Sequence, residues 1–172
     1  MGSSADLYIR CSSDSELAEI RTRYPGVQMD VGALFAKAPV SHILRFTRQS
    51  VQAVADELCR EVIYLSFSSV ADSIQFTRCT PGRLHRHLQH GMYVEQSLWE
   101  EVEGDPEPWE AAAFFPATMI RGWDDPQDLD RKLRVEELYR RRFVVQGEDD
   151  HYIDGRESAR AAAHFYGLSG WR

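Results

Sequence analysis

Three histidines within six residues are the first candidates for chemistry in this chain: His85, His87 and His90. Neutral imidazole is a common metal ligand, so this group could supply ligands to zinc or nickel. On a regular strand His85 and His87 share one face and His90 points to the other, unless a bulge reverses the parity. A site built on His85 and His87 therefore needs a carboxylate from elsewhere in the chain. The alternatives are a solvent-facing strand surface and a pH-sensitive or partner-facing patch.

The second candidate is the acidic segment 95–110, EQSLWEEVEGDPEPWE, which holds seven acidic residues and no basic one. Paired carboxylates can do acid–base work of the glycosidase type, although neighbouring carboxylates on a loop usually form only a solvated surface. Two tryptophans set among the acids favour a protein-binding surface, and burial of both indoles in the core is the alternative. The residues that we assign to this surface are Trp99, Glu100, Glu101, Glu103, Glu107 and Trp109.

A further candidate contact residue is Trp171, the last residue but one. A terminal tryptophan either folds back onto the core or, when exposed, serves as a contact residue.

Nucleophilic catalysis has little support in the sequence. Cys79 could pair with a hairpin histidine, but no glycines follow it that could form an oxyanion hole. Gly-x-Ser-x-Gly, dinucleotide-binding and phosphate-loop motifs are absent. The three cysteines contain no Cys-x-x-Cys pair, so we interpret them as reduced, buried thiols rather than zinc ligands or disulfides. The sequence favours a non-catalytic protein without a cofactor.

Net charge narrows the range of partners. A formal charge of −7 over 172 residues argues against nucleic-acid binding and suits a basic protein partner. No stretch of the chain is apolar for long enough to span a membrane, and the N-terminus lacks a signal-peptide pattern. We therefore expect a cytoplasmic protein.

A β-hairpin at about residues 72–91 is predicted to position the histidines. It follows a strand at 62–67, where β-branched and aromatic residues indicate at least one buried face. Apolar residues at even spacing lie on either side of a Thr-Pro-Gly turn, so both arms are expected to bury the same face. These residues are Ile74, Phe76, Leu84 and Leu88.

The spacing of apolar residues predicts helices over residues 13–23, 48–60, 127–143 and 155–166. At the start of the first helix, Ser13 and Glu16 have the spacing of a capping box. Cys59 is expected on the inner face of the second of these helices. Pro106 and Pro108 oppose a regular helix, so a short helix over 95–102 should lead into a loop. The remaining predicted segments are strands at 6–11, 27–36 and 42–47, and a strand or buried turn at 111–116.

These elements predict a single α+β domain over residues 5–172, after a disordered or vector-derived start at residues 1–4. Its sheet should be mostly antiparallel and centred on the hairpin. Three to four helices should pack mainly on one face of that sheet.

The succession YLSFSSVADSIQF, SLWEEVEGDPEPWE and AAAHFYGLSGW resembles a group of single-domain bacterial proteins. That group shares a W-E-x-V-E-G-x-P-E-P-W-E segment and a closing Gly-Leu-x-Gly-Trp. The resemblance covers about residues 62–110 and 160–171. It implies a bacterial, cytosolic origin, but no activity. It also implies that the acidic segment and the terminal tryptophan are regular parts of the domain.

The function expected from these observations is a non-catalytic protein-binding module. An acidic immunity or inhibitor protein that neutralises a basic bacterial toxin or enzyme fits, because charge complementarity speeds association. One alternative is a metal-dependent hydrolase that uses His85 and His87 with carboxylates of the acidic segment. The other is a homo-oligomeric subunit whose interface uses the hairpin edge or Trp171.

Overall fold

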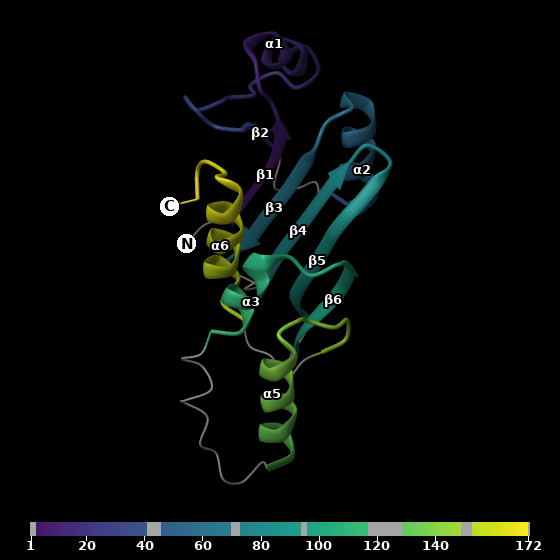
Figure 1. Ribbon diagram of the computed structural model, residues 1–172, viewed down its shortest axis with the longest axis vertical. Coiled ribbons are helices and arrows are strands. Elements are labelled where there is room, and N and C mark those ends of the chain that lie inside the picture. The colour runs from purple at the N-terminus through teal and green to yellow at the C-terminus, as the bar shows by residue number, and fades with distance from the viewer. Residues whose placement is uncertain are drawn as a thin grey trace.

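The computed structural model describes residues 3–40, 46–69, 73–93, 96–116, 129–148 and 153–171. A six-stranded sheet of order β2-β1-β3-β4-β5-β6 forms its centre, and every neighbouring pair is antiparallel (Figure 1). The strands are β1 (Ser3–Arg10), β2 (Phe35–Pro39), β3 (Val62–Ser68), β4 (Ser73–Thr80), β5 (Arg83–Tyr93) and β6 (Gln96–Gly104). The predicted α+β fold with an antiparallel sheet is confirmed. β1 begins at Ser3, inside the start that the sequence analysis set aside.

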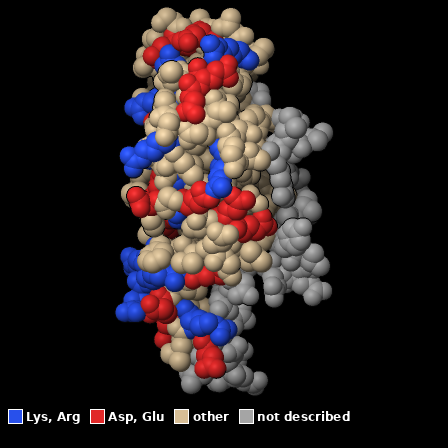
Figure 2. Space-filling view, turned by 90° about the vertical axis from the view of Figure 1, so that its right-hand side faces the viewer, with Lys and Arg blue, Asp and Glu red and all other residues tan. Residues whose placement is uncertain are grey.

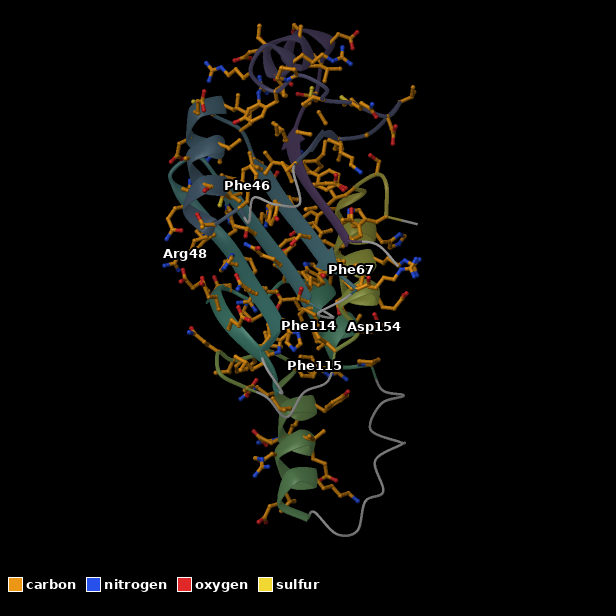
Figure 3. All side chains as sticks on the ribbon, turned by 180° about the vertical axis from the view of Figure 1, so that it is seen from behind. Phe46, Arg48, Phe67, Phe114, Phe115 and Asp154 are labelled. Carbon is orange, nitrogen blue, oxygen red and sulfur yellow. The ribbon has the colours of Figure 1, made fainter. Side chains whose placement is uncertain are left out.

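Helices cover both faces of this sheet. The helices are α1 (Asp14–Arg23), α2 (Arg48–Leu58), α3 (Pro108–Phe114), α5 (Leu129–Arg141) and α6 (Gly155–Tyr166). α1 and α2 pack into one core, whereas α3 and α6 pack into another on the opposite face (Figures 1 and 3). α5 extends past the end of the sheet and contributes Val135, Leu138 and Tyr139 to this second core. The described helices thus exceed the expected three to four and are shared between the two faces. None of them combines the length and apolar character needed to cross a membrane.

β3 explains why two cores form. Ile63, Leu65 and Phe67 belong to the core under α3 and α6, while Val62 and Tyr64 belong to the core under α2. Because both sets of side chains are buried, the strand is a nearly continuous apolar run and needs cover on both sides.

The β4–β5 hairpin forms as predicted, but with a bulge near its turn. Ile74, Phe76 and Leu88 lie in the core under α3 and α6, as expected. Leu84 pairs with Cys79 and packs into the other core, because the register shifts between Arg78 and Cys79. One extra residue reverses the parity of a strand, so the prediction that both arms bury the same face is wrong at Leu84.

The acidic segment folds differently from its prediction. Residues 96–104 form the edge strand β6 rather than a helix, because they pair along β5. Pro108 stands in the first turn of α3, where its missing N–H costs nothing, and Glu107 and Glu110 form a capping box. Most of 111–116 is therefore helical. A residue that reads as a helix breaker in the sequence here begins a helix.

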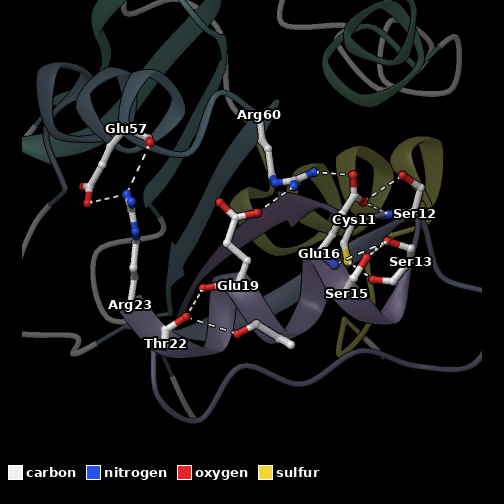
Figure 4. Close-up of polar contacts among 11 residues, drawn as sticks. Cys11, Ser12, Ser13, Ser15, Glu16, Glu19, Thr22, Arg23, Glu57 and Arg60 are labelled. Carbon is white, nitrogen blue, oxygen red and sulfur yellow. Dashed lines mark hydrogen bonds and ion pairs between the residues drawn. The ribbon is translucent and has the colours of Figure 1, made fainter.

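Most of the other local predictions fit the structure. Ser13 caps α1 by accepting a hydrogen bond from the Glu16 N–H, and Arg60 holds Glu16 in an ion pair of 2.8 Å (Figure 4). α5 and α6 lie in the predicted windows. The strand expected at 27–36 is displaced to β2, and most of the 42–47 prediction lies outside the described residues. Cys59 is exposed rather than buried, because it is the left-handed cap that ends α2.

Candidate functional site

Both tryptophans of the acidic segment lie in the core. The Trp99 side chain has no exposed surface, and its ring centroid is 4.9 Å from that of Phe114. Trp109 is 4% exposed and packs edge-on against Phe76 at 5.1 Å. Neither indole can contact a partner while the fold is intact. Their place in the expected contact surface is thereby corrected, and their role is to anchor β6 and α3.

A buried ion pair fixes the turn between these two elements. Arg86 and Glu110 are 1% and 0% exposed, and Arg86 donates from Nε and Nη2 to the two carboxylate oxygens at 2.8 and 2.6 Å. Arg86 also donates to the Gly104 carbonyl at 2.7 Å, and the Glu107 N–H donates to Glu110 at 2.9 Å. Such complete hydrogen bonding is what allows a charge pair to be buried. The signal that sequence reasoning missed is an arginine at an inward position of the predicted hairpin.

Glu107, which was expected to contact a partner, is also buried. Its carboxylate accepts from Arg78 at 3.1 Å and from the Trp109 indole at 3.3 Å. Burial raises the pKa of Glu107 above its usual value, although these hydrogen bonds act in the opposite direction. Arg78 continues the network to Glu61 at 2.7 Å. Burial acts to raise the pKa of Glu61, but hydrogen bonds from arginines outweigh it and lower that pKa.

The carboxylates of Glu101 and Glu103 remain at the surface, where their side chains are 47% and 40% exposed. Glu101 lies 3.2 Å from the His87 Nε2, and Glu103 pairs with Arg48. Arg48 stands at the start of α2 (Figure 3). Glu100 is half-buried and accepts a hydrogen bond from the side chain of Gln89. Figure 2 shows a band of acidic side chains across the middle of this face, with basic and further acidic side chains above and below it.

The three histidines occupy separate environments. His85 lines a pocket, and its Nε2 is 2.8 Å from the Thr80 hydroxyl. His87 is buried on the α2 side of the sheet, and His90 packs against Trp99 with ring centroids 5.0 Å apart. The hairpin bulge separates the faces of His85 and His87, contrary to the regular-strand expectation. The described residues contain no group of three or more His, Cys, Asp or Glu side chains that could hold a metal ion.

Thr77, His87 and Glu101 form a chain of the residue types found in hydrolytic triads. The Thr77 hydroxyl is 2.8 Å from the His87 Nδ1, and Nε2 faces Glu101. Thr77 and His87 are, however, 0% and 1% exposed, so a substrate cannot reach the hydroxyl. Burial also lowers the pKa of His87, which favours the neutral ring at pH 7. We interpret the chain as a satisfied buried network.

Cys79 is equally unsuited to nucleophilic chemistry. It is fully buried against the α2 core, and burial raises the pKa of its thiol to about 11. The thiolate, which is the reactive form, is therefore scarce near neutral pH.

Trp171 folds back onto the core and is only half-buried. Its indole N–H donates to the Tyr8 hydroxyl at 2.7 Å, and that hydroxyl donates to the Ser169 carbonyl at 2.7 Å. The tail is thus tied to β1. Of the two roles open to a terminal tryptophan, the structure assigns Trp171 a place in the packing of the domain.

An open pocket of about 410 Å³ lies where the hairpin turn, the start of α3 and the end of α6 come together. Arg78, Arg83 and His85 line one side, and Asp105 and Phe165 are among the residues that line the rest. Sequence reasoning missed this pocket because three segments distant in the chain build it.

Comparison with known proteins gave no match: no family model, curated protein or solved structure is similar to this chain. The geometry of the chain itself must therefore support any functional assignment.

Proposed function

We propose that this chain is a non-catalytic binding module that recognises a basic protein through Glu101 and Glu103 on β6. The observation that carries the proposal is the position of these two carboxylates. They stand exposed on an edge strand that Trp99 anchors from the opposite side, so they are both accessible and fixed in place. A preorganised charged surface loses little conformational entropy when a partner docks.

Neighbouring segments hold β6 rigidly. The Trp99 N–H donates to the Glu148 carbonyl at 3.1 Å, and the Gly147 N–H donates to the Trp99 carbonyl at 2.7 Å. At the other end of the strand, the buried Arg86 holds the Gly104 carbonyl. These contacts also cover part of the sheet edge, which limits nonspecific strand pairing.

The charge of the protein favours a cationic partner. The net charge is −7; Glu103 is paired with Arg48, whereas Glu101 faces the ring of His87, which burial favours in its neutral form. Arginine or lysine side chains of a partner can share Glu101 and Glu103 with these neighbours. Electrostatic steering of this kind raises association rates by about 10- to 1,000-fold. An acidic, rigid contact surface that speeds association suits an immunity or inhibitor protein of the bacterial cytoplasm, which acts on a basic toxin or enzyme.

A capture experiment tests the proposal. Immobilised wild-type protein and the variant Glu101→Lys/Glu103→Lys are exposed to lysate of the source organism, and bound proteins are identified and quantified. Asp130→Lys/Glu136→Lys is the matched control, because it changes two exposed acids on α5 by the same total charge.

We expect the wild type and the control to retain the same basic protein and the β6 variant to lose at least about 90% of it, a tenfold weakening. A milder variant, Glu101→Gln/Glu103→Gln, should show an intermediate loss. Equal capture by the two Lys variants would reject β6 as the contact surface. Melting curves must show that all the variants are folded.

A further inference from the structure

The pocket beside β6 has walls of contrasting chemistry. Its hairpin side carries the nitrogen-bearing side chains of Arg78, Arg83 and His85. The α6 side carries two aromatic residues, Phe165 and Tyr166, and prolines of the turn before α3 complete the lining. Phe165 is 49% exposed, so its ring is accessible to a ligand in the pocket.

The two arginines that line this pocket differ in whether they are paired with carboxylates. Arg78 is held by Glu61 and Glu107, and its guanidinium lies 5.5 Å from the centroid of the Tyr166 ring. Arg83, by contrast, makes no ion pair with any described residue. Both oxygens of Glu107 are already used, by Arg78 and by the Trp109 indole. The cation available to a ligand is therefore Arg83, next to His85.

Gly104 fixes the shape of the pocket. Its φ of +80° lies in the left-handed region, and a Cβ there would stand 2.1 Å from the His85 carbonyl oxygen. Only glycine allows the chain to turn so tightly against the hairpin. The turn that carries Asp105 and the prolines is thereby pressed close to the basic side of the pocket.

We propose that this pocket binds a small planar ring that carries a carboxylate. The ring lies against Phe165 and the proline rings, and the carboxylate accepts hydrogen bonds from Arg83 and from a nitrogen of His85. A planar guanidinium matches a carboxylate with two parallel N–H groups, which favours this anion over a cation. A volume of about 410 Å³ is within the range of small-molecule sites. This site is independent of the carboxylates of Glu101 and Glu103.

Asp105 lines the same pocket with a negative charge, opposite in sign to that of Arg83, so the two residues provide paired tests of the proposal. Asp105 is exposed and has no hydrogen bond or ion pair to another described residue, so both it and Arg83 can be changed without loss of a described contact. Removing Arg83 should weaken binding of an anion, while removing the charge of Asp105 should strengthen it. A cation-binding pocket would show the reverse order.

The experiment is an NMR titration of the full chain, labelled with ¹⁵N, with four probes: benzoate, acetate, benzyl alcohol and benzamidine. Benzoate carries the ring and the charge, acetate only the charge, benzyl alcohol only the ring, and benzamidine the opposite charge. The backbone amides of Arg83, His85, Gly104 and Tyr166 report on the pocket. The amide of Ile20, on the distant α1, serves as an internal control.

We expect benzoate to shift the pocket amides and to bind more tightly than the other three probes. Arg83→Gln should weaken benzoate about fivefold and Asp105→Asn should strengthen it about twofold, as expected for single exposed charges. The proposal is overturned by tighter binding of benzamidine, by weaker benzoate binding in Asp105→Asn, or by the absence of benzoate shifts at the pocket amides. Equal shifts at the pocket and at the α1 control would show nonspecific binding and would overturn it as well.

Discussion

The buried Arg86–Glu110 pair leads to the most quantitative prediction. Glu110→Leu leaves the Arg86 guanidinium in the core without its two carboxylate bonds of 2.8 and 2.6 Å. Removing one partner of a buried pair costs about 3–5 kcal/mol of the free energy of unfolding. A domain of this kind has about 5–15 kcal/mol in total, so the variant should be severely destabilised. Arg86→Met should show a loss of similar size.

The double variant Arg86→Met/Glu110→Leu removes both charges and should be more stable than either single variant. It still loses the bonds to the Gly104 carbonyl and from the Glu107 N–H. The buried Glu107 N–H is left without this partner, which costs about 1–3 kcal/mol, so the double variant should remain less stable than the wild type. The coupling free energy between the two positions should be at least about 2 kcal/mol.

Urea unfolding followed by tryptophan fluorescence measures these free energies. For a chain of this length, a loss of about 4 kcal/mol corresponds to a melting temperature roughly 10 °C lower. Single variants that each lose less than about 1 kcal/mol, or a double variant whose loss equals the sum of the two, would refute the reasoning. Glu157→Gln, on the exposed side of α6, is the control and should change the stability by less than about 0.5 kcal/mol.

Three further predictions concern other parts of the chain. Tyr8→Phe removes the hydroxyl that links β1 to Trp171, which should cost about 1–2 kcal/mol in urea unfolding and shift tryptophan emission to the red; unchanged stability and emission would argue against this link. The Arg60 guanidinium, with help from the Ser12 N–H, lowers the pKa of Glu16 from 4.5 to about 2. Since this pKa is lower in the folded state, the contribution of Glu16 is present above pH 4.5 and is lost as the pH falls toward 2. Glu16→Gln should therefore flatten the stability profile in that window, and an unaltered profile would contradict the ion pair. Of the three thiols, the exposed Cys59 should react fastest with a thiol reagent in the native protein and Cys79 only after unfolding, so a Cys59→Ser variant that kept the fast phase would contradict the assignment.

Local signals in the sequence were sufficient for much of the fold. The apolar run of β3, the Thr-Pro-Gly turn of the hairpin and the cap at Ser13 each depend on neighbours in the chain. The same holds for α6, whose Asp154 N-cap and Gly167 cap stand directly at its ends. Local sequence specifies these elements, and the rest of the chain only has to bury their apolar side chains.

Features that depend on distant contacts could not be predicted. β6 has acids on one side and Trp99 on the other, but a bulge between its pairs with Gln89 and His90 breaks the alternation that would mark a strand. The hairpin bulge separated His85 from His87 in the same way. The helices α3 and α6 decide which aromatic side chains of the sheet are buried. Because they come later in the chain, the sequence around each aromatic residue does not show its burial.

The most direct test of the binding proposal is the association rate of the captured partner, measured by surface plasmon resonance at several salt concentrations. We expect the wild-type rate to fall steeply as salt rises, since exposed charges are screened beyond about 10 Å at 0.1 M salt. For Glu101→Lys/Glu103→Lys we expect a rate about tenfold lower at low salt, with a weaker salt dependence, and for Asp130→Lys/Glu136→Lys a rate close to wild type. Equal association rates and salt slopes for these two variants would contradict the assignment of β6 as the contact surface.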